Sequence, residues 1–279
     1  MVKHWPGVWW LTDAVLQIDW QRPWFSPWAT HGKPVLQAWQ CQPDDLPSAF
    51  NQLLLTHGAS ELSPKFHGWK IHQGDSSLEP PFRFVSQHTL PAATAYETFI
   101  FQHKQIPTRN NAHDFFNGLC WLRFPKTKAQ LNRMQAQAIA RDGVGAQRGA
   151  LRDALTLFDE NAALLHAPDL LWQALRNKDW RSLLVTHRAL WQETRCVLFG
   201  HALLEKCLRP YKGITAHVLN VPMPGLQTDA EIDDWLCQSL RSEHLQTKPF
   251  VPLPIAGIPG WWPGNEDHDF FEDKKVFRD

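Results

Sequence analysis

The stretch HDFFNGLCWLRFPKTKAQLNRMQAQAIAR, residues 113–141, decides the fold that this chain is expected to adopt. Its first part is mostly apolar and predicts a buried helix over about 113–124, which stops before Pro125 because proline does not continue a helix. Its second part predicts a helix over 127–141 with an apolar face of Leu131, Met134 and Ala138. A buried helix followed by an amphipathic one indicates a mainly helical core.

The flanking segments predict further helices and a few short strands. Thr94 and Glu97 have the spacing of a capping box, which favours a helix through about residue 103. Residues 155–167 favour two short strands around a turn at 159–161, with a continuous helix through Leu164 as the alternative. The predicted fold class is therefore α+β and predominantly helical. The remaining expected elements are helices over 169–177, 179–191 and 197–208, a buried strand over 214–221, and a helix over 228–243 opened by a capping box of Thr228 and Glu231.

Prolines and tryptophans set the two ends of the chain apart from this core. Prolines recur through residues 1–90, which argues against long helices there, although 45–55 has the pattern of a short one. We expect an irregular arm over 1–90 that packs on a core of 91–279, the two forming one structural unit with an irregular C-terminal tail. Such large rings bury much area and pin loops to a core. The expected anchors are Trp9, Trp10, Trp20, Trp24, Trp28 and Trp39 in the arm and Trp261 and Trp262 in the tail.

The composition limits the partners and the compartment. The chain has 279 residues, with 28 basic and 28 acidic side chains and a net charge of zero, so its whole surface is not built to hold nucleic acid or anionic lipid. Its five cysteines never have the C-x-x-C spacing and indicate reduced thiols. No apolar run approaches the ~18 residues that a membrane helix needs, and no signal peptide is recognisable. We expect a soluble cytoplasmic protein without a membrane partner.

The first candidate site lies at the start of the buried helix. His113 and Asn117 are four residues apart and project from the same side of a helix. His113 and Asp114 would serve as metal ligands or as an acid–base pair, and Arg109 would hold an anionic group of the substrate. The alternative for Asp114 is structural, since Asn111 as N-cap would put it at the third helical position.

Two further groups could add to that site. Asp153, Asp159 and Glu160 are candidate catalytic carboxylates, with Arg148 as a second binder of the substrate anion; the alternative is an ordinary turn and an ion pair. His201 and Glu205 are four apart on a predicted helix, and their alternative is a solvated helix face. The hypothetical metal ligands, which would hold a divalent metal if the fold gathered them, are His113, Asp153, His201 and His217.

A local excess of positive charge supports a different kind of function. The polar stripe of the 127–141 helix begins at Lys126 and ends at Arg141 and would contact nucleic acid or an acidic partner, with a solvated basic helix as the alternative. No dinucleotide-binding, P-loop or nucleophile-elbow motif is present. The cations between residues 123 and 152 are Arg123, Lys126, Lys128, Arg133, Arg141, Arg148 and Arg152, against Asp142 alone.

Four segments in order resemble a bacterial family known only as a domain of unknown function. They are IPTRNNAHDFFNGLCWLRFPKTKAQLN, RGALRDALTLFDENAALL, LFGHALLEKCLRPYKGITAHV and GIPGWWPGN followed by VFR, and the likeness runs from about Pro91 to Arg278. The resemblance implies a stand-alone bacterial protein and supplies no activity or cofactor. The chain departs from the family pattern at Ala162, where the pattern has a glycine, which weakens the case for a left-handed turn there.

Two hypotheses of function follow. The first is a metal-assisted hydrolase acting on an anionic or phosphate-bearing small molecule, in which the metal would activate a water molecule. The alternative is a non-catalytic module that binds nucleic acid or an acidic partner through the stripe from Lys126 to Arg141. The first hypothesis requires that the distant imidazoles and carboxylates meet around one cleft, and the second does not.

Overall fold

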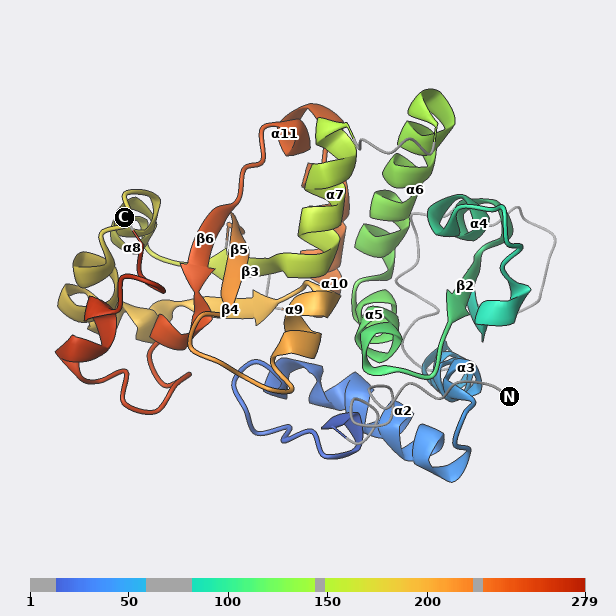
Figure 1. Ribbon diagram of the computed structural model, residues 1–279, viewed down its shortest axis with the longest axis horizontal. Coiled ribbons are helices and arrows are strands. Elements are labelled where there is room, and N and C mark those ends of the chain that lie inside the picture. The colour runs from blue at the N-terminus through green and yellow to red at the C-terminus, as the bar shows by residue number, and fades with distance from the viewer. Residues whose placement is uncertain (1–13, 59–81, 144–148, 223–227, 279) are drawn as a thin grey trace.

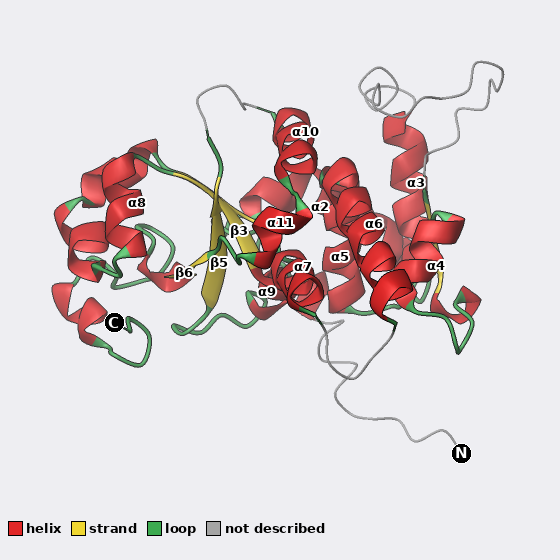
Figure 2. Cartoon of the chain, turned by 90° about the horizontal axis from the view of Figure 1, so that it is seen from above, coloured by secondary structure: helices red, strands yellow, loops and turns green. Residues whose placement is uncertain are grey.

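The fold of the computed structural model combines a helical body with two small sheets (Figure 1). The structure describes residues 14–58, 82–143, 149–222 and 228–278. Most of these residues are helical, so the predicted class, α+β and predominantly helical, is confirmed. Figure 2 shows α8 at one end of an elongated molecule and α3 and α4 at the other, with the four-stranded sheet between α8 and the helical body.

The helices of the body surround a central antiparallel pair, α6 and α7. The two run side by side, with α4 on the far side of α6 and with α5 and α9 at their lower ends (Figure 1). The Gln135 side chain on α6 donates a hydrogen bond of 3.2 Å to Thr156 on α7. The helices of this body are α4 (Tyr96–His103), α5 (Ala112–Arg123), α6 (Pro125–Asp142), α7 (Ala150–Asn161) and α9 (His201–Lys206).

The larger sheet has the strand order β4-β3-β5-β6, and its strand β3 follows α7 directly in the chain. Strand β3 (Ala162–His166) starts where α7 ends and pairs antiparallel with β4 (Arg195–Leu198) and parallel with β5 (Thr215–Asn220). Strand β6 (Val251–Pro254) closes the sheet against β5. A second, parallel sheet joins β1 (Arg83–Ser86) to β2 (Gln105–Thr108). The remaining α-helices are α2 (Ala29–Cys41), α3 (Leu46–Gly58), α8 (Asp169–Arg176), α10 (Asp229–Ser239) and α11 (Ser242–Gln246).

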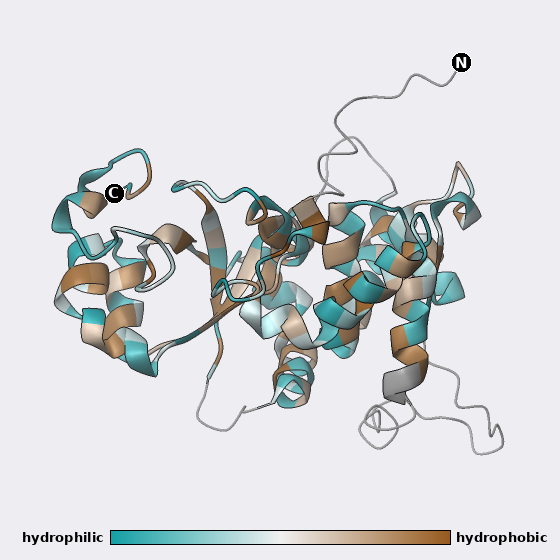
Figure 3. Cartoon of the chain, turned by 90° about the horizontal axis from the view of Figure 1, so that it is seen from below, coloured by the Kyte–Doolittle hydropathy of each residue, from teal (hydrophilic) through white to brown (hydrophobic). Residues whose placement is uncertain are grey.

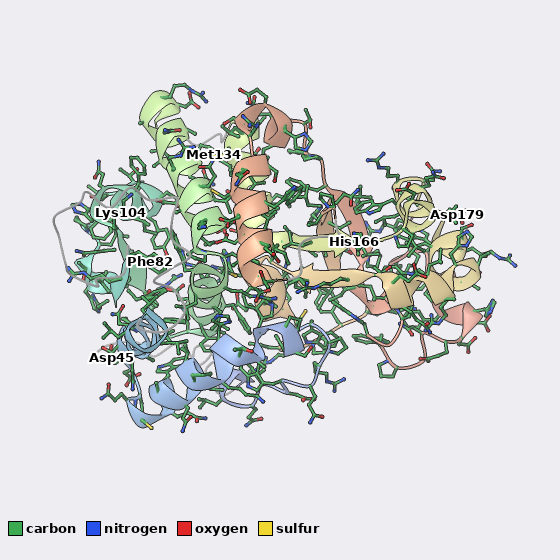
Figure 4. All side chains as sticks on the ribbon, turned by 180° about the vertical axis from the view of Figure 1, so that it is seen from behind. Asp45, Phe82, Lys104, Met134, His166 and Asp179 are labelled. Carbon is green, nitrogen blue, oxygen red and sulfur yellow. The ribbon has the colours of Figure 1, made fainter. Side chains whose placement is uncertain are left out.

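Helix α5 is the most deeply buried element of the body. Every residue of α5 except His113 is buried. The Asn111 side chain accepts the Asp114 N–H at 2.8 Å, which caps the helix as predicted. Helix α6 starts at Pro125, two residues earlier than expected, because the first helical position needs no N–H donor. Figure 3 shows hydrophilic and hydrophobic residues alternating around the outer helices, and Figure 4 shows side chains filling the space beside α6, where Met134 is labelled.

The N-terminal stretch is more regular than its prolines predicted. Helices α2 and α3 each span 13 residues, and Pro34 lies inside α2. The prediction of an irregular arm is therefore wrong for α2, because the burial of one face offsets the hydrogen bond that proline removes. The short helix predicted over 45–55 is confirmed by α3. Trp24, Trp28 and Trp39 are buried anchors as expected, whereas Trp9 and Trp10 lie outside the described residues.

Several predicted boundaries shift where chain segments pair with one another. Residues 155–161 belong to α7 and only 162–166 form a strand, so both expectations for 155–167 are wrong in part. The helix predicted over 197–208 starts only at His201, because Arg195–Leu198 pairs with β3. The helix expected over 179–191 is broken into π and 3-10 turns. The strand over 214–221 and the Thr228–Glu231 capping box are confirmed.

Helix α4 has a different start from the predicted one. It begins at Tyr96 with Ala95 as N-cap and has no side-chain cap. The Glu97 carboxylate accepts a hydrogen bond of 2.6 Å from Asn132 on α6 instead of closing a box with Thr94. Glu97 therefore joins two helices rather than capping one.

Gly200 places α9 directly against the end of α7. A Cβ atom at this position would lie 2.4 Å from backbone atoms of Glu160 and Asn161. We expect Gly200→Ala to destabilise the fold by about 1–3 kcal/mol, because two backbones would have to separate. Gly213→Ala is the matched control: its Cβ would meet only the Tyr211 ring, at 3.5 Å, and a change below about 0.5 kcal/mol is expected. Urea unfolding followed by circular dichroism measures both, and equal stabilities for the two variants would contradict the close approach.

Candidate functional site

A polar cavity of about 470 Å³ opens between α4, α5, α6, α7 and α9. It collects residues from segments that lie more than a hundred positions apart in the sequence, from Gln87 to His201. Leu131 and Leu155 give part of its wall an apolar surface. The polar and charged residues of the wall include Tyr96, Glu97, Arg109, His113, Asp114, Asn117, Lys128, Asn132, Arg152, Asp159, Glu160 and His201.

Two imidazoles meet in this cavity. The Nε2 atoms of His113 and His201 lie 3.1 Å apart, and their rings are at 81° to one another. His113 stands in the first turn of α5 and His201 is the first residue of α9, so the contact joins two helix starts. The His113 side chain is 36% exposed and that of His201 only 7%, so His113 is the one that a ligand can reach.

A carboxylate lies behind each ring. Glu205 Oε2 is 2.9 Å from Nδ1 of His113, which is hydrogen-bonding distance. Asp159 Oδ2 is 3.6 Å from Nδ1 of His201, a longer electrostatic contact. Glu205 was expected on a solvated helix face; the structure corrects this, since it is 24% exposed and orients the accessible imidazole.

The pKa shifts of the two histidines indicate which ring carries the proton that the two Nε2 atoms share. The hydrogen bond that His113 donates to Glu205 raises the pKa of His113, while burial lowers the pKa of His201 to about 4. His113 is therefore the more easily protonated ring, and it donates from Nδ1 to Glu205 and from Nε2 to the neutral His201. The remaining ring proton of His201 then lies on Nδ1, which faces Asp159.

A buried lysine lies next to the imidazole pair. Lys128 is 4% exposed, and its ammonium donates to Asn117 Oδ1 at 2.9 Å and to Asp159 Oδ1. Asn117 in turn donates to the Tyr96 hydroxyl at 3.2 Å. Burial acts to raise the pKa of Asp159, but the Lys128 ammonium together with His201 and His113 outweighs it and holds that pKa below its usual value. Asp159 thus stays ionised between the lysine and His201.

Lys128 is the site residue that sequence analysis missed. It had been counted only among the cations of a basic helix. Its position three residues before Leu131 puts it on the apolar face of α6 rather than on the polar stripe, and that is the signal that could have identified it. A lysine on the core face of a helix is costly unless it is paired.

Arg109 and Asp114 form an ion pair at the mouth of the cavity. The Arg109 N–H and Nε donate to Asp114 Oδ2 at 2.6 and 3.0 Å, and Nη2 donates to Oδ1 at 2.8 Å. Asp114 therefore holds the segment before α5 instead of closing a capping box. This geometry favours the structural interpretation of Asp114 and leaves Arg109 with its charge already paired.

The four hypothetical metal ligands are not gathered. His113 and His201 meet, but Asp153 is exposed on α7, six residues before Asp159, and so points about 120° away from it around the helix. His217 lies on β5 opposite Ala162 and does not line the cavity. Within the described ranges, no three or more His, Cys, Asp or Glu side chains are placed to hold a metal ion. Glu160 does line the cavity, while Arg148 falls outside the described residues.

Most charges of the basic stripe are paired with carboxylates. Lys126 forms an ion pair with Asp234, and Arg141 forms one with Asp142. Arg133 donates to Gln130 within the same helix. Lys128 turns inward to Asp159 and belongs to the cavity. The stripe therefore presents far less free positive charge than its sequence indicates.

The fold and cavity define a mainly helical α+β protein with a pre-formed polar site. Comparison with protein families matches residues 82–279 to a family described as a protein of unknown function (DUF3025), and the chain belongs to this family. The resemblance inferred from its segments is confirmed. Neither the curated proteins nor the solved structures contain a match. Among the described helices, none combines the length and apolar character that crossing a membrane requires.

The bond between Glu205 and His113 makes stability depend on pH. Because the pKa of His113 is raised, the pair stabilises the fold fully below the unfolded value of about 6.5 and loses this effect as pH rises through the folded value. We expect Glu205→Gln to lower the free energy of unfolding at about pH 6 and to be nearly neutral at about pH 9. The effect should not exceed about 1 kcal/mol, since solvent screens the partly exposed His113.

Chemical denaturation at both pH values measures this difference. The exposed Glu243, substituted in the same way, serves as the control and should show no pH-dependent loss. A loss for Glu205→Gln that grows toward high pH would contradict the assignment of the proton to His113.

Proposed function

We propose that this protein is a hydrolase that acts on an anionic, for example phosphate-bearing, substrate in the cavity, with His113 and His201 as its acid–base pair. The observation that carries the proposal is the contact of the two Nε2 atoms at 3.1 Å, with a carboxylate behind each ring. His113 is also the one residue of α5 that is not buried. An imidazole that lines a cavity and is the one partly exposed side chain of an otherwise buried helix is placed for contact with a ligand.

Proton transfer is the chemistry that this pair supports. Each Nε2 can hold the shared proton, so His113 can give its Nε2 proton to the leaving group while the neutral His201 accepts a proton from the attacking water molecule. Glu205 fixes the His113 ring and stabilises its protonated form, as a carboxylate does behind a catalytic imidazole. Asp159 stabilises positive charge that reaches His201.

Lys128 supplies the stabilisation of negative charge. An ammonium group has three protons, and Asn117 and Asp159 accept two of them. Among the described residues no acceptor is found for the third, which leaves it for an oxyanion of the substrate. In a buried setting such a donor acts strongly on developing negative charge.

The small number of possible metal ligands in the described part of the cavity favours acid–base catalysis over metal-assisted hydrolysis. A catalytic zinc ion takes three protein ligands, and here two imidazoles converge without a third ligand among the described residues. The Nδ1 atoms and their carboxylates face away from the point where the two Nε2 atoms meet. The proposed reaction therefore uses no metal-bound water.

Substitution of the paired groups should remove activity. The two histidine variants should keep the fold, whereas Lys128→Met should also lower stability because it leaves Asp159 without its partner. We expect His113→Gln, His201→Gln and Lys128→Met each to lower kcat/KM by about 10²–10⁴-fold, the range of a lost acid–base or charge-stabilising group. The assay is release of p-nitrophenol from a panel of carboxylate, phosphate monoester and phosphodiester substrates. His217→Gln and Asp153→Asn are matched controls, because neither residue lines the cavity. Equal losses in the control variants, or no turnover of any substrate class by the intact chain, would overturn the proposal.

Removal of metal ions should leave the enzyme unchanged. After exhaustive dialysis against EDTA, we expect the same kcat/KM and the same Tm as before dialysis. Added zinc, manganese or magnesium should not increase the rate. A rate that falls on dialysis and returns with one of these ions would replace the acid–base mechanism by the metal-assisted one.

The binding-module alternative has less support. Its motivation was the excess of cations between residues 123 and 152, and ion pairs account for most of the described ones, including the bidentate bond of Arg123 to Asp229. Its distinguishing experiment is the salt dependence of DNA or RNA binding. For the location we propose the bacterial cytoplasm, which suits the five free cysteines.

A further inference from the structure

The cavity is long, and its two ends differ in chemistry. On α6 the wall runs from Lys128 through Leu131 and Gln135 to Ile139. On the antiparallel α7 it runs from Asp159 back to Arg152. Seven residues separate Arg152 from Asp159, which is about 10 Å along a helix. Arg152 therefore lies at the end of the cavity remote from the imidazole pair.

Arg152 is the cavity cation that forms no ion pair with any residue that the structure describes. Its Nε is buried and has no hydrogen-bond partner among the described residues, and its Nη1 donates only to the Gly143 carbonyl, at 3.3 Å. The carboxylate of Asp142 is within electrostatic range but is bound by both arms of Arg141. No ion pair of Arg152 forms within the described part of the chain.

The other cations of the wall are neutralised by carboxylates. Arg109 is paired with Asp114, and Lys128 with Asp159. Acidic groups are therefore concentrated toward the imidazole end, whereas the remote end has a guanidinium with an unused donor. A buried guanidinium donor without a partner favours a ligand that brings an anionic oxygen.

We propose that Arg152 anchors the anionic group of an elongated substrate, about 10 Å from the bond whose hydrolysis the imidazole pair catalyses. The inference rests on the proposed function for the position of that bond. The anionic group is a carboxylate or a phosphate, since both suit a guanidinium. Leu131 and Leu155 contact the spacer between the two ends, and the Gln135–Thr156 hydrogen bond lies in the same stretch of wall.

Binding of non-hydrolysable probes tests the anchor without turnover. The probes are the mono-anilides of succinate, adipate, suberate and sebacate, each with one free carboxylate and one neutral amide, and the matching ω-phosphates. Isothermal titration should show the tightest binding for the longer chains, because only these span from Arg152 to the imidazoles. Arg152→Met should weaken that binding by at least about tenfold, the loss of a charge-assisted hydrogen bond, and Arg152→Lys by less.

The control variant is Arg176→Met, because Arg176 is exposed on α8 and outside the cavity. It should bind every probe as the unsubstituted chain does. Affinity that is independent of chain length, or unchanged in Arg152→Met, or absent for all probes, would overturn the anchor. Tighter binding of the carboxylate series than of the phosphate series, or the reverse, identifies the anionic group.

A second experiment tests the anchoring role of Arg152 separately from the proposed hydrolase activity. The mono-p-nitrophenyl esters of the same dicarboxylic acids should be hydrolysed with a kcat/KM that rises with chain length, and Arg152→Met should raise KM more than it lowers kcat. Probe binding that depends on Arg152, without hydrolysis of any ester, would sustain the anchor and refute the hydrolase. Hydrolysis that depends on His113 but not on Arg152 would refute the anchor alone.

Discussion

The pairing of Lys128 with Asp159 is the interaction on which the site depends. A buried ammonium and carboxylate are each costly to remove from water, and their contact between α6 and α7 compensates for much of this cost. Asp159 also faces His201, and Lys128 also holds Asn117 on α5. One ion pair thus fixes the relative positions of α5, α6, α7 and the start of α9, which are the walls of the cavity. A hydrophobic pair can hold two helices together equally well, so what the two charges add here is the polar character of the cavity wall.

The helices that could be predicted are those whose signal is local. Residues 113–124 have a dense apolar pattern with an N-cap before them and a proline after them, and the helix appears within one or two residues of its expected limits. Segments that acquire a partner from a distant part of the chain could not be predicted. Arg195–Leu198 forms a strand because β3 offers an edge, and no pattern within these four residues encodes that edge. The helix α2 likewise tolerates Pro34 only because tertiary packing buries Val35, Leu36 and Trp39.

The site was predicted as a set of residue types, but their grouping depended on the fold. His113, Asn117, Asp159, Glu160 and His201 do line one cavity. Asp153 was grouped with Asp159 by proximity in sequence, and helical geometry separates them because six positions do not complete two turns. For Glu205 and for the basic helix with Lys128, the sequence leaves a solvated face as one alternative, and the roles of both residues depend on which helix lies opposite them. Sequence periodicity specifies the face of a helix, whereas the identity of the neighbouring helix comes only from the tertiary structure.

The carbonyl of Ala162 accepts hydrogen bonds from the N–H groups of both Phe199 and Gly200, at 2.9 and 2.8 Å. These bonds join the end of α7, the first residue of β3 and the start of α9, so one wall of the cavity is built directly into the four-stranded sheet. The opposite wall, α4, leads into β2 and therefore belongs to the small parallel sheet. The two sides of the cavity are thus connected to two different sheets. The width of the space between α4 and α7 therefore depends on how the two sheets are placed relative to one another.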